Sequence, residues 1–256
     1  IDLIFPHHEN EIAQSEACTG KPFAKYWMHN NFIQFGSEKM SKSLGNVIKA
    51  RDYMNQYHPE ILNFLLLSVH YRSKLTIDQD QTLQTIQRLA RIYTALKTAN
   101  ELATDNQTQA DKEFMTVLEN SQTKFKTGLD DDLNTPIAFA AIFELIRQFN
   151  HETSHKKQKN PLLKGAAHLF LQQMSHWGQI LNLFNQSPTI FLTTLNTILI
   201  SLLNIDAQLI ETLIEQRNEA RKTKNFEFAD KLRQELLDMQ IEIQDTPTKT
   251  YWNVKC

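Results

Sequence analysis

Apolar residues recur every three or four positions along most of the chain, which is the spacing of one face of an α-helix. The pattern is clearest from Asp78 to Leu102 and predicts a long amphipathic helix there. Its apolar positions are Leu83, Ile86, Leu89, Ile92 and Leu96. Spacing and end signals predict further helices over residues 6–17, 49–57, 59–69, 109–126, 136–150, 161–184, 206–224 and 225–240.

Strand patterns occur at fewer places. Residues 2–5 are a short apolar run that predicts a buried strand, and residues 26–35 mix β-branched and aromatic residues, which predicts a strand pair. Polar and apolar residues alternate over 241–244 and again over 250–253, which predicts a small terminal β-hairpin. Because the chain has only six glycines, tight turns should be few, and we predict a mainly α fold.

The composition indicates a globular protein. Its 256 residues and 41% apolar content are enough for one large domain or two to three smaller ones with real cores. The most apolar stretch, residues 190–205, is too short and too polar for a membrane span, so we interpret it as a buried or interfacial segment. The chain starts inside an apolar run with no charged region ahead of it, so no signal peptide is expected and the chain should begin inside a domain.

Charge and cysteine content narrow the class of protein. A formal net charge of −2 argues against a wholesale basic coat for nucleic acid, so any RNA contact must come from local basic faces. The two cysteines, Cys18 and Cys256, provide no disulfide framework, which fits a reducing cytoplasm.

Residues 38–46 form a short run, Glu-Lys-Met-Ser-Lys-Ser-Leu-Gly-Asn, that we call the lysine loop. Lys39 and Lys42 put positive charge where a polyphosphate leaving group gains negative charge, and the hydroxyls of Ser41 and Ser43 can complete a cradle. We predict a phosphate-binding loop. The alternative is a solvated charged turn.

His7 and Glu11 stand four residues apart on the first predicted helix. That spacing places an imidazole and a carboxylate on one face, where they suit two ligands of a single metal ion; the alternative is an exposed helix pair. A zinc-protease motif is excluded because Ile12 stands where the second histidine after His8-Glu9 would be needed. The aspartates at 130–132 do not converge on one point, so we interpret them as a solvated turn and cap rather than a Mg²⁺ site.

The two predicted helices over residues 206–240 form a hairpin that concentrates basic side chains. Phe226 at its tip can stack on an unpaired base, and Arg221 and Asp230 can address base edges. We therefore predict an RNA-binding face; the alternative is an ordinary hairpin with a charged outer face. The basic residues are Arg217, Arg221, Lys222, Lys224, Lys231 and Arg233.

Several of these runs, in this order, resemble those of cysteinyl-tRNA synthetases, which are class I aminoacyl-tRNA synthetases. The most specific are Phe-Pro-His-His-Glu-Asn-Glu at 5–11 and Lys-Met-Ser-Lys-Ser at 39–43. Tyr71-Arg72-Ser73, residues 129–136, Ala229-Asp230 and Asp245-Thr246-Pro247 follow. From end to end, the chain is similar to the C-terminal part of a bacterial-type enzyme, a little over half of the full protein.

The resemblance implies three domains. Residues 1–73 would be the remnant of a Rossmann-like α/β catalytic domain, and residues 74–187 an α-helical bundle that forms the stem-contact and DALR-type tRNA-binding region. Residues 188–256 would be a small α+β anticodon-recognition domain. The predicted fold is therefore mainly α, with a small α/β remnant at its start.

The resemblance also implies an activity, that of a ligase in protein biosynthesis that activates L-cysteine with ATP and transfers it to tRNA-Cys. Lys42 would be the principal ATP-phosphate contact, assisted by Lys39, with Ser41 and Ser43 in the ATP-binding loop. Asp2 would help to hold the ribose or the amino acid, and Mg²⁺ would accompany ATP.

The metal and RNA contacts are implied in the same way. His7 and Glu11 would hold one Zn²⁺ per subunit, with two thiolate ligands outside this chain. Cys18 lies where the family has no ligand. The tRNA contacts would be Arg221, Phe226, Asp230 and Asp245. A cytoplasmic monomer is expected.

Two departures from the family pattern matter. No His-x-Gly-His signature occurs in these residues, so the chain alone is expected to be inactive. Lys249 stands where the terminal turn of the family usually has glycine, so that hairpin should differ in shape or be looser. Two other functions remain open, a tRNA-binding fragment without catalysis and a cysteine ligase acting on an amino sugar. The basic hairpin speaks against the sugar ligase, because a sugar substrate needs no anticodon reader.

Overall fold

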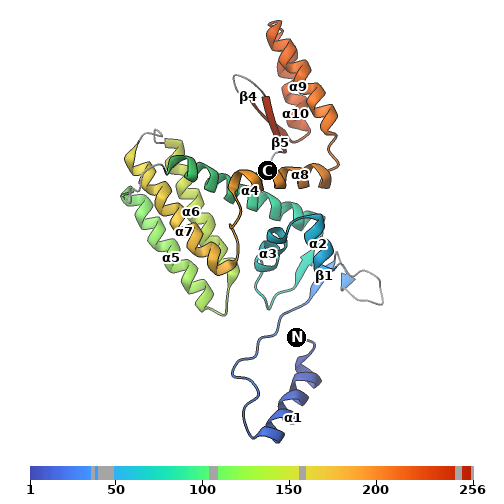
Figure 1. Ribbon diagram of the computed structural model, residues 1–256, viewed down its shortest axis with the longest axis vertical. Coiled ribbons are helices and arrows are strands. Elements are labelled where there is room, and N and C mark those ends of the chain that lie inside the picture. The colour runs from blue at the N-terminus through green and yellow to red at the C-terminus, as the bar shows by residue number, and fades with distance from the viewer. Residues whose placement is uncertain (36–37, 40–48, 104–108, 156–159, 246–249, 255–256) are drawn as a thin grey trace. The chain divides into compact units, whose positions relative to one another are not determined.

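The computed structural model describes residues 1–35, 38–39, 49–103, 109–155, 160–245 and 250–254 (Figure 1). The chain divides into two compact units. Unit 1 contains residues 1–85 and 98–185, and unit 2 contains residues 86–97 and 186–256. Helices dominate both units, which confirms the mainly α fold class.

Unit 1 begins with a short helical segment. One π-helical turn, η1 (Ile4–His8), leads into α1 (Glu9–Thr19), and Gly20 ends that helix with a left-handed φ of 63°, which glycine adopts easily. The strand predicted over residues 2–5 is wrong. A buried strand needs neighbours on both sides, whereas no described strand pairs with these residues and Phe5 is 78% exposed.

A three-stranded sheet follows in the order β2-β1-β3. β1 (Ile33–Phe35) is antiparallel to β2 (Glu38–Lys39) and parallel to β3 (Leu75–Ile77), with Ile33 opposite Leu75. The predicted strand pair over 26–35 is therefore real only in its last residues, since residues 26–32 have no regular structure. β3 was not predicted, because three residues are too few to show an alternation.

The three helices that follow β2 in the chain, two before β3 and one after it, lie where the sequence predicts them. They are α2 (Ala50–Gln56), α3 (Pro59–Leu67) and α4 (Gln79–Leu102). The side chain of Asp78 caps α4 by accepting a hydrogen bond from the backbone N–H of Gln81 at 2.7 Å.

Three helices of unit 1 lie side by side as a bundle (Figure 1). They are α5 (Lys112–Asp130), α6 (Thr135–His155) and α7 (Pro161–Leu181). Stacked aromatic pairs fill the core between them: Phe149 and Phe170 at 4.5 Å, and Phe125 and Trp177 at 4.9 Å between ring centroids. These rings account for the 3.6-residue periodicity of the sequence.

Gly178, near the end of α7, allows a close backbone approach. A Cβ at this position would lie 2.5 Å from the carbonyl oxygen of Leu183, a buried residue whose N–H donates to the Gly178 carbonyl at 2.9 Å. We expect Gly178→Ala to lower the free energy of unfolding by about 1–2 kcal/mol, because overpacking outweighs the better helix propensity of alanine. Chemical denaturation of the chain measures this. Ser175→Ala, on the exposed face of α7, is the control, and an unchanged or raised stability in Gly178→Ala would contradict the close contact.

Besides the central part of α4, the described residues of unit 2 form three helices and a hairpin. Its elements are α8 (Pro188–Leu202), α9 (Ala207–Lys222), α10 (Phe226–Asp238), β4 (Ile241–Asp245) and β5 (Thr250–Val254). The caps predicted at Asp206 and Asn225 are present, and β4 pairs with β5 in antiparallel register, as predicted.

The central part of α4 belongs to this unit and supplies part of its core. The ring of Tyr93 lies 4.3 Å from that of Phe191 on α8, and both side chains are buried. The apolar stretch at 190–205 is thus largely α8, with one face buried. Among the described residues, no single helix is long and apolar enough to cross a membrane, although α8 and α9 together reach that length and composition with a bend of 109° between them.

Candidate functional site

The metal-ligand pair predicted from the sequence lies where η1 runs into α1. His8 and Glu9 at this junction have right-handed helical backbone angles, so the helix continues from His7 to Glu11 and brings both side chains to one face. Both residues are exposed, and neither has a hydrogen-bond partner within the described part of the chain. An imidazole and a carboxylate that are free in this way are of the ligand types that Zn²⁺ accepts, and they could hold such an ion together with further ligands.

The described residues do not complete that site. No group of three or more His, Cys, Asp or Glu side chains within the described ranges could hold a metal ion. Cys18 is an exposed free thiol near the other end of α1. The expectation that two further ligands lie outside this chain therefore stays a prediction.

An aromatic cluster that the sequence did not predict packs beside this pair. His8 Nδ1 lies 2.9 Å from His29 Nε2, so one ring donates a hydrogen bond to the other. The indole of Trp27 is stacked on His29 at 6.1 Å between centroids and lies 5.2 Å from His8. Partial burial, and then the charge of His8, lower the pKa of His29, which favours a neutral His29 ring. Phe23 extends the cluster at 5.7 Å from Trp27.

Of the lysine loop, the structure describes only the first two residues, Glu38 and Lys39. Lys39 lies in β2 rather than in a loop, so a short strand begins inside the predicted run. Ser41, Lys42 and Ser43 lie outside the described residues. Asp2, predicted to hold ribose or amino acid, is exposed in the turn ahead of η1. The roles of these residues therefore stay predictions.

The predicted RNA face lies on the α9–α10 hairpin and the strand beside it. Phe226, the first residue of α10, is 61% exposed, and Asp230 is exposed one turn further on. An exposed aromatic ring at a helix start is accessible for stacking on a base.

Arg221 and Asp245, both predicted to contact tRNA, bind each other. Arg221 Nη1 donates to Asp245 Oδ2 at 2.6 Å, and Arg217 donates to both carboxylate oxygens at 2.9 and 2.8 Å. Hydrogen bonds from Arg217, and then from Thr250, hold the pKa of Asp245 far below its ordinary value.

Arg217 is one of the basic residues that the sequence places on the predicted RNA face, but it is not exposed there. Its side chain is only 6% exposed and lies against β4 as the partner of Asp245. The sequence did contain a signal for this shared partner, because Arg217 is four residues before Arg221 and lies on the same helix face. The signal is weak, because a charged residue on a basic helix is usually solvated.

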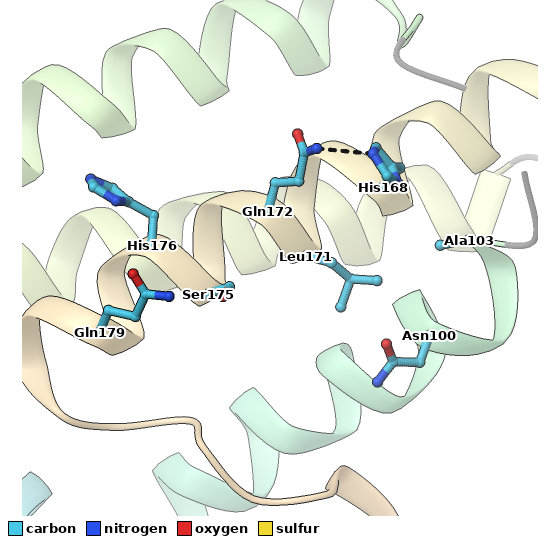
Figure 2. A pocket seen from close by; sticks show the side chains of 8 residues that line it. All are labelled: Asn100, Ala103, His168, Leu171, Gln172, Ser175, His176 and Gln179. Atoms are coloured by element: carbon cyan, nitrogen blue, oxygen red, sulfur yellow. Dashed lines mark hydrogen bonds between the residues drawn. The ribbon is translucent and has the colours of Figure 1, made fainter. Parts of the chain in front are cut away.

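A hollow of about 530 Å³ lies between α7 and the end of α4 (Figure 2). Its walls carry hydrogen-bonding side chains, among them Asn100, His176 and Gln179, and Gln172 donates to His168 Nε2 at 3.0 Å. None of the residues predicted to take part in the reaction lines this hollow.

Two family models match the chain. Residues 1–87 match the tRNA synthetases class I (C) catalytic domain, and residues 124–185 match the DALR domain. The first part of the chain is therefore similar to the catalytic domain of class I aminoacyl-tRNA synthetases, and a later part is similar to DALR domains.

The curated relatives of the chain indicate which kind of aminoacyl-tRNA synthetase it resembles. The chain is 39% identical over 254 residues to the cysteine--tRNA ligase of Bdellovibrio bacteriovorus and 40% identical over 257 residues to that of Oleidesulfovibrio alaskensis. Each match covers 99% of this chain and 53% of the relative, so the chain spans about half the length of the curated relatives it matches. The chain is thus homologous, over its whole length, to about half of a cysteine--tRNA ligase, which confirms the resemblance drawn from its motifs.

A partial likeness to a solved structure was also found. It relates 62% of this chain to 23% of a chain in the LeuRS-tRNA-LeuAMS ternary complex of Agrobacterium radiobacter K84, with a TM-score of 0.44 and 16% identity.

Proposed function

We propose that this chain is the part of a cysteine-tRNA ligase that carries the lysine loop, two ligands of a zinc site and the tRNA-reading helices. The observation that carries the proposal is the free His7–Glu11 pair on one helical face, in the same class I region as the lysine loop. The relatives named cysteine--tRNA ligase support the same activity.

The proposed reaction is activation of L-cysteine by ATP, followed by transfer of the cysteinyl group to tRNA-Cys. Lys42 binds the ATP phosphates, and Lys39 assists as pyrophosphate departs, because both ammonium groups stabilise the charge that develops on the leaving group. Ser41 and Ser43 add hydrogen bonds, Asp2 helps to hold the ribose or the amino acid, and Mg²⁺ enters with ATP.

His7 and Glu11 hold one zinc ion together with two thiolates from outside this chain. When bound, Zn²⁺ supplies a position for the soft thiolate of L-cysteine, for which a serine hydroxyl is a poor substitute. By holding the zinc ion, the two residues would make selection depend on the thiol group of cysteine rather than on the size of its side chain. The difference in affinity between a thiolate and a hydroxyl for zinc is large enough to make an editing step unnecessary.

The α9–α10 hairpin reads the tRNA. Phe226 stacks on an unpaired base, and Asp230 contacts a base edge. Arg221 and Asp245 take part as a preformed pair, since the bond between them fixes both side chains before RNA arrives. A cytoplasmic monomer is the expected form of the protein.

The chain alone is expected to be inactive, because it has no His-x-Gly-His signature. A stand-alone tRNA-binding module is therefore the second candidate, and the exposed Phe226 favours it as much as it favours the ligase. Filter binding of this chain to tRNA-Cys, repeated at increasing salt, tests RNA binding separately from catalysis. A chain lacking residues 206–256 should lose that binding, and undiminished binding would show that the hairpin is not the RNA face.

Cysteine-dependent ATP–pyrophosphate exchange by the full-length protein tests the ligase activity. We expect exchange with cysteine and none with serine, and cysteinylation of tRNA-Cys in the presence of ATP. Bound zinc, measured by metal analysis, should fall in His7→Ala and stay unchanged in the neighbouring Glu9→Ala, which lies on another face of the helix. An active protein that transfers cysteine to an amino sugar and not to tRNA would overturn the proposal in favour of the third candidate.

A further inference from the structure

Two runs that the proposed function leaves unused, Tyr71-Arg72-Ser73 and residues 129–136, meet in unit 1. Asp132, in the turn between α5 and α6, accepts a hydrogen bond from the Tyr71 hydroxyl at 2.6 Å. Arg72 donates to the same carboxylate, from Nε to Oδ2 at 2.6 Å and from Nη2 to Oδ1 at 3.3 Å. The fold thus joins two segments that are 60 residues apart in the sequence.

The turn that carries Asp132 is held in an unusual backbone conformation. Asp132 and Leu133 have φ angles of 52° and 55°, in the left-handed region that residues with a Cβ rarely adopt. Such a conformation persists only where surrounding bonds fix it. Here the N–H of Asn134 donates to the Gly128 carbonyl at 2.9 Å, and His70 Nε2 donates to the carbonyl oxygen of Asp132 at 3.0 Å.

Asn31 forms hydrogen bonds with the same two residues, Tyr71 and Arg72, that bind Asp132. The backbone N–H of Asn31 donates to the Tyr71 carbonyl at 2.9 Å, and its side-chain amide donates to the Arg72 carbonyl at 2.8 Å. Asn31 lies two residues ahead of β1, the strand that runs into the lysine loop. A continuous set of hydrogen bonds therefore connects the α5–α6 turn to that strand.

Because the side chains that form these hydrogen bonds are exposed, we infer that the bonds fix the local geometry more than they stabilise the fold. The Arg72 and Asp132 side chains are 58% and 46% exposed, and ion pairs so open to water contribute little to folding. Hydrogen bonds from Arg72 and then from Tyr71 lower the pKa of Asp132 to about 2, so the carboxylate stays charged and the bidentate contact persists at neutral pH.

We propose that Asp132 is a positioning residue for the lysine loop: through Tyr71 and Arg72 it fixes Asn31 and β1 relative to the α5–α6 turn. The inference rests on the proposed function, in which the lysine loop binds ATP. It assigns a task to a residue that the sequence had suggested was part of a solvated turn. His7 and Glu11 form none of these hydrogen bonds themselves, and the link to them is less direct: it runs from Asn31 through His29, which contacts His8.

The test compares Asp132→Asn with Asp131→Asn in the full-length protein. Asparagine matches aspartate in size and tolerates a left-handed backbone, and Asp131 is the exposed neighbour that undergoes the same change of charge. In Asp132→Asn we expect the amides of residues 31–35 to exchange with solvent about 10-fold faster, because local opening is easier there. The KM for ATP in pyrophosphate exchange should rise about 10-fold, because a small misplacement of the loop weakens its contact with ATP, and it should rise by more than the KM for cysteine.

A double variant separates coupling from independent damage. If Arg72 acts through Asp132, adding Arg72→Met to Asp132→Asn should produce no further change in either measurement. Unchanged amide exchange at residues 31–35 in Asp132→Asn would overturn the positioning role, and so would a fall in the amount of active enzyme with both KM values unaltered. If the wild-type protein shows no cysteine-dependent exchange, the proposed function fails, and the amide exchange alone then decides whether Asp132 holds β1.

Discussion

Lys42→Ala in the full-length protein is expected to lower the rate of cysteine-dependent ATP–pyrophosphate exchange by about 100-fold or more, the usual effect of removing one group that stabilises developing charge in a transition state. The lysine loop starts with the residues of β2 and precedes α2 in the sequence, and Lys42 stands at its middle position. Because the charge on the departing pyrophosphate grows as the adenylate forms, the loss should appear mainly in kcat rather than in the KM for cysteine.

Lys49→Ala is the matched control for this prediction. Lys49 directly precedes α2, only seven residues after Lys42, and its substitution removes the same charge from an exposed position. Exchange in Lys49→Ala should stay near the wild-type rate. A Lys42→Ala protein with an undiminished rate would show that the lysine loop is a solvated turn, and it would do so without affecting the assignment of the zinc pair.

Much of the fold could be predicted because long amphipathic helices carry their own signals. The apolar stripe and the Asp78 cap defined α4, and Asn225 defined the start of α10, since each is a local preference that the tertiary structure does not oppose. The short strands could not be predicted in this way. Whether residues 2–5 or 75–77 form a strand depends on which segment lies beside them, and that is a property of the fold rather than of the run itself.

In the candidate site, too, features set by local sequence could be predicted and features set by tertiary contacts could not. The spacing of His7 and Glu11 could be predicted, because four residues place two side chains on one helix face wherever the helix lies. The contact between His8 and His29 joins residues that are 21 positions apart, and the ion pair between Arg72 and Asp132 joins residues that are 60 positions apart. No periodicity of the sequence reports such contacts. The aspartates at 130–132 were therefore interpreted as a solvated turn, which describes the backbone there but misses the ion pair of Asp132.

The Arg217–Asp245 pair leads to the second large effect, on the stability of unit 2. We expect Asp245→Ala to lower the free energy of unfolding of this unit by about 2–3 kcal/mol, because it leaves the buried guanidinium of Arg217 without its carboxylate. Arg221 is about half exposed and can return to water, so its loss of a partner should matter less. Hydrogen exchange of the β4 and β5 amides measures the change, and a decrease of this size corresponds to about 30- to 150-fold faster exchange.

The matched control is Asp238→Ala, at the exposed end of α10, where the carboxylate only accepts a hydrogen bond from Gln234. The pH dependence gives a further test. Since the folded-state pKa of Asp245 is depressed, the pair stabilises the unit fully above the unfolded-state pKa of about 4, and this contribution falls as the pH drops further. The difference between wild type and Asp245→Ala should thus be constant above about pH 5 and shrink below pH 4. A difference that stayed constant down to acidic pH would mean that packing, and not the charge of Asp245, keeps β4 in place.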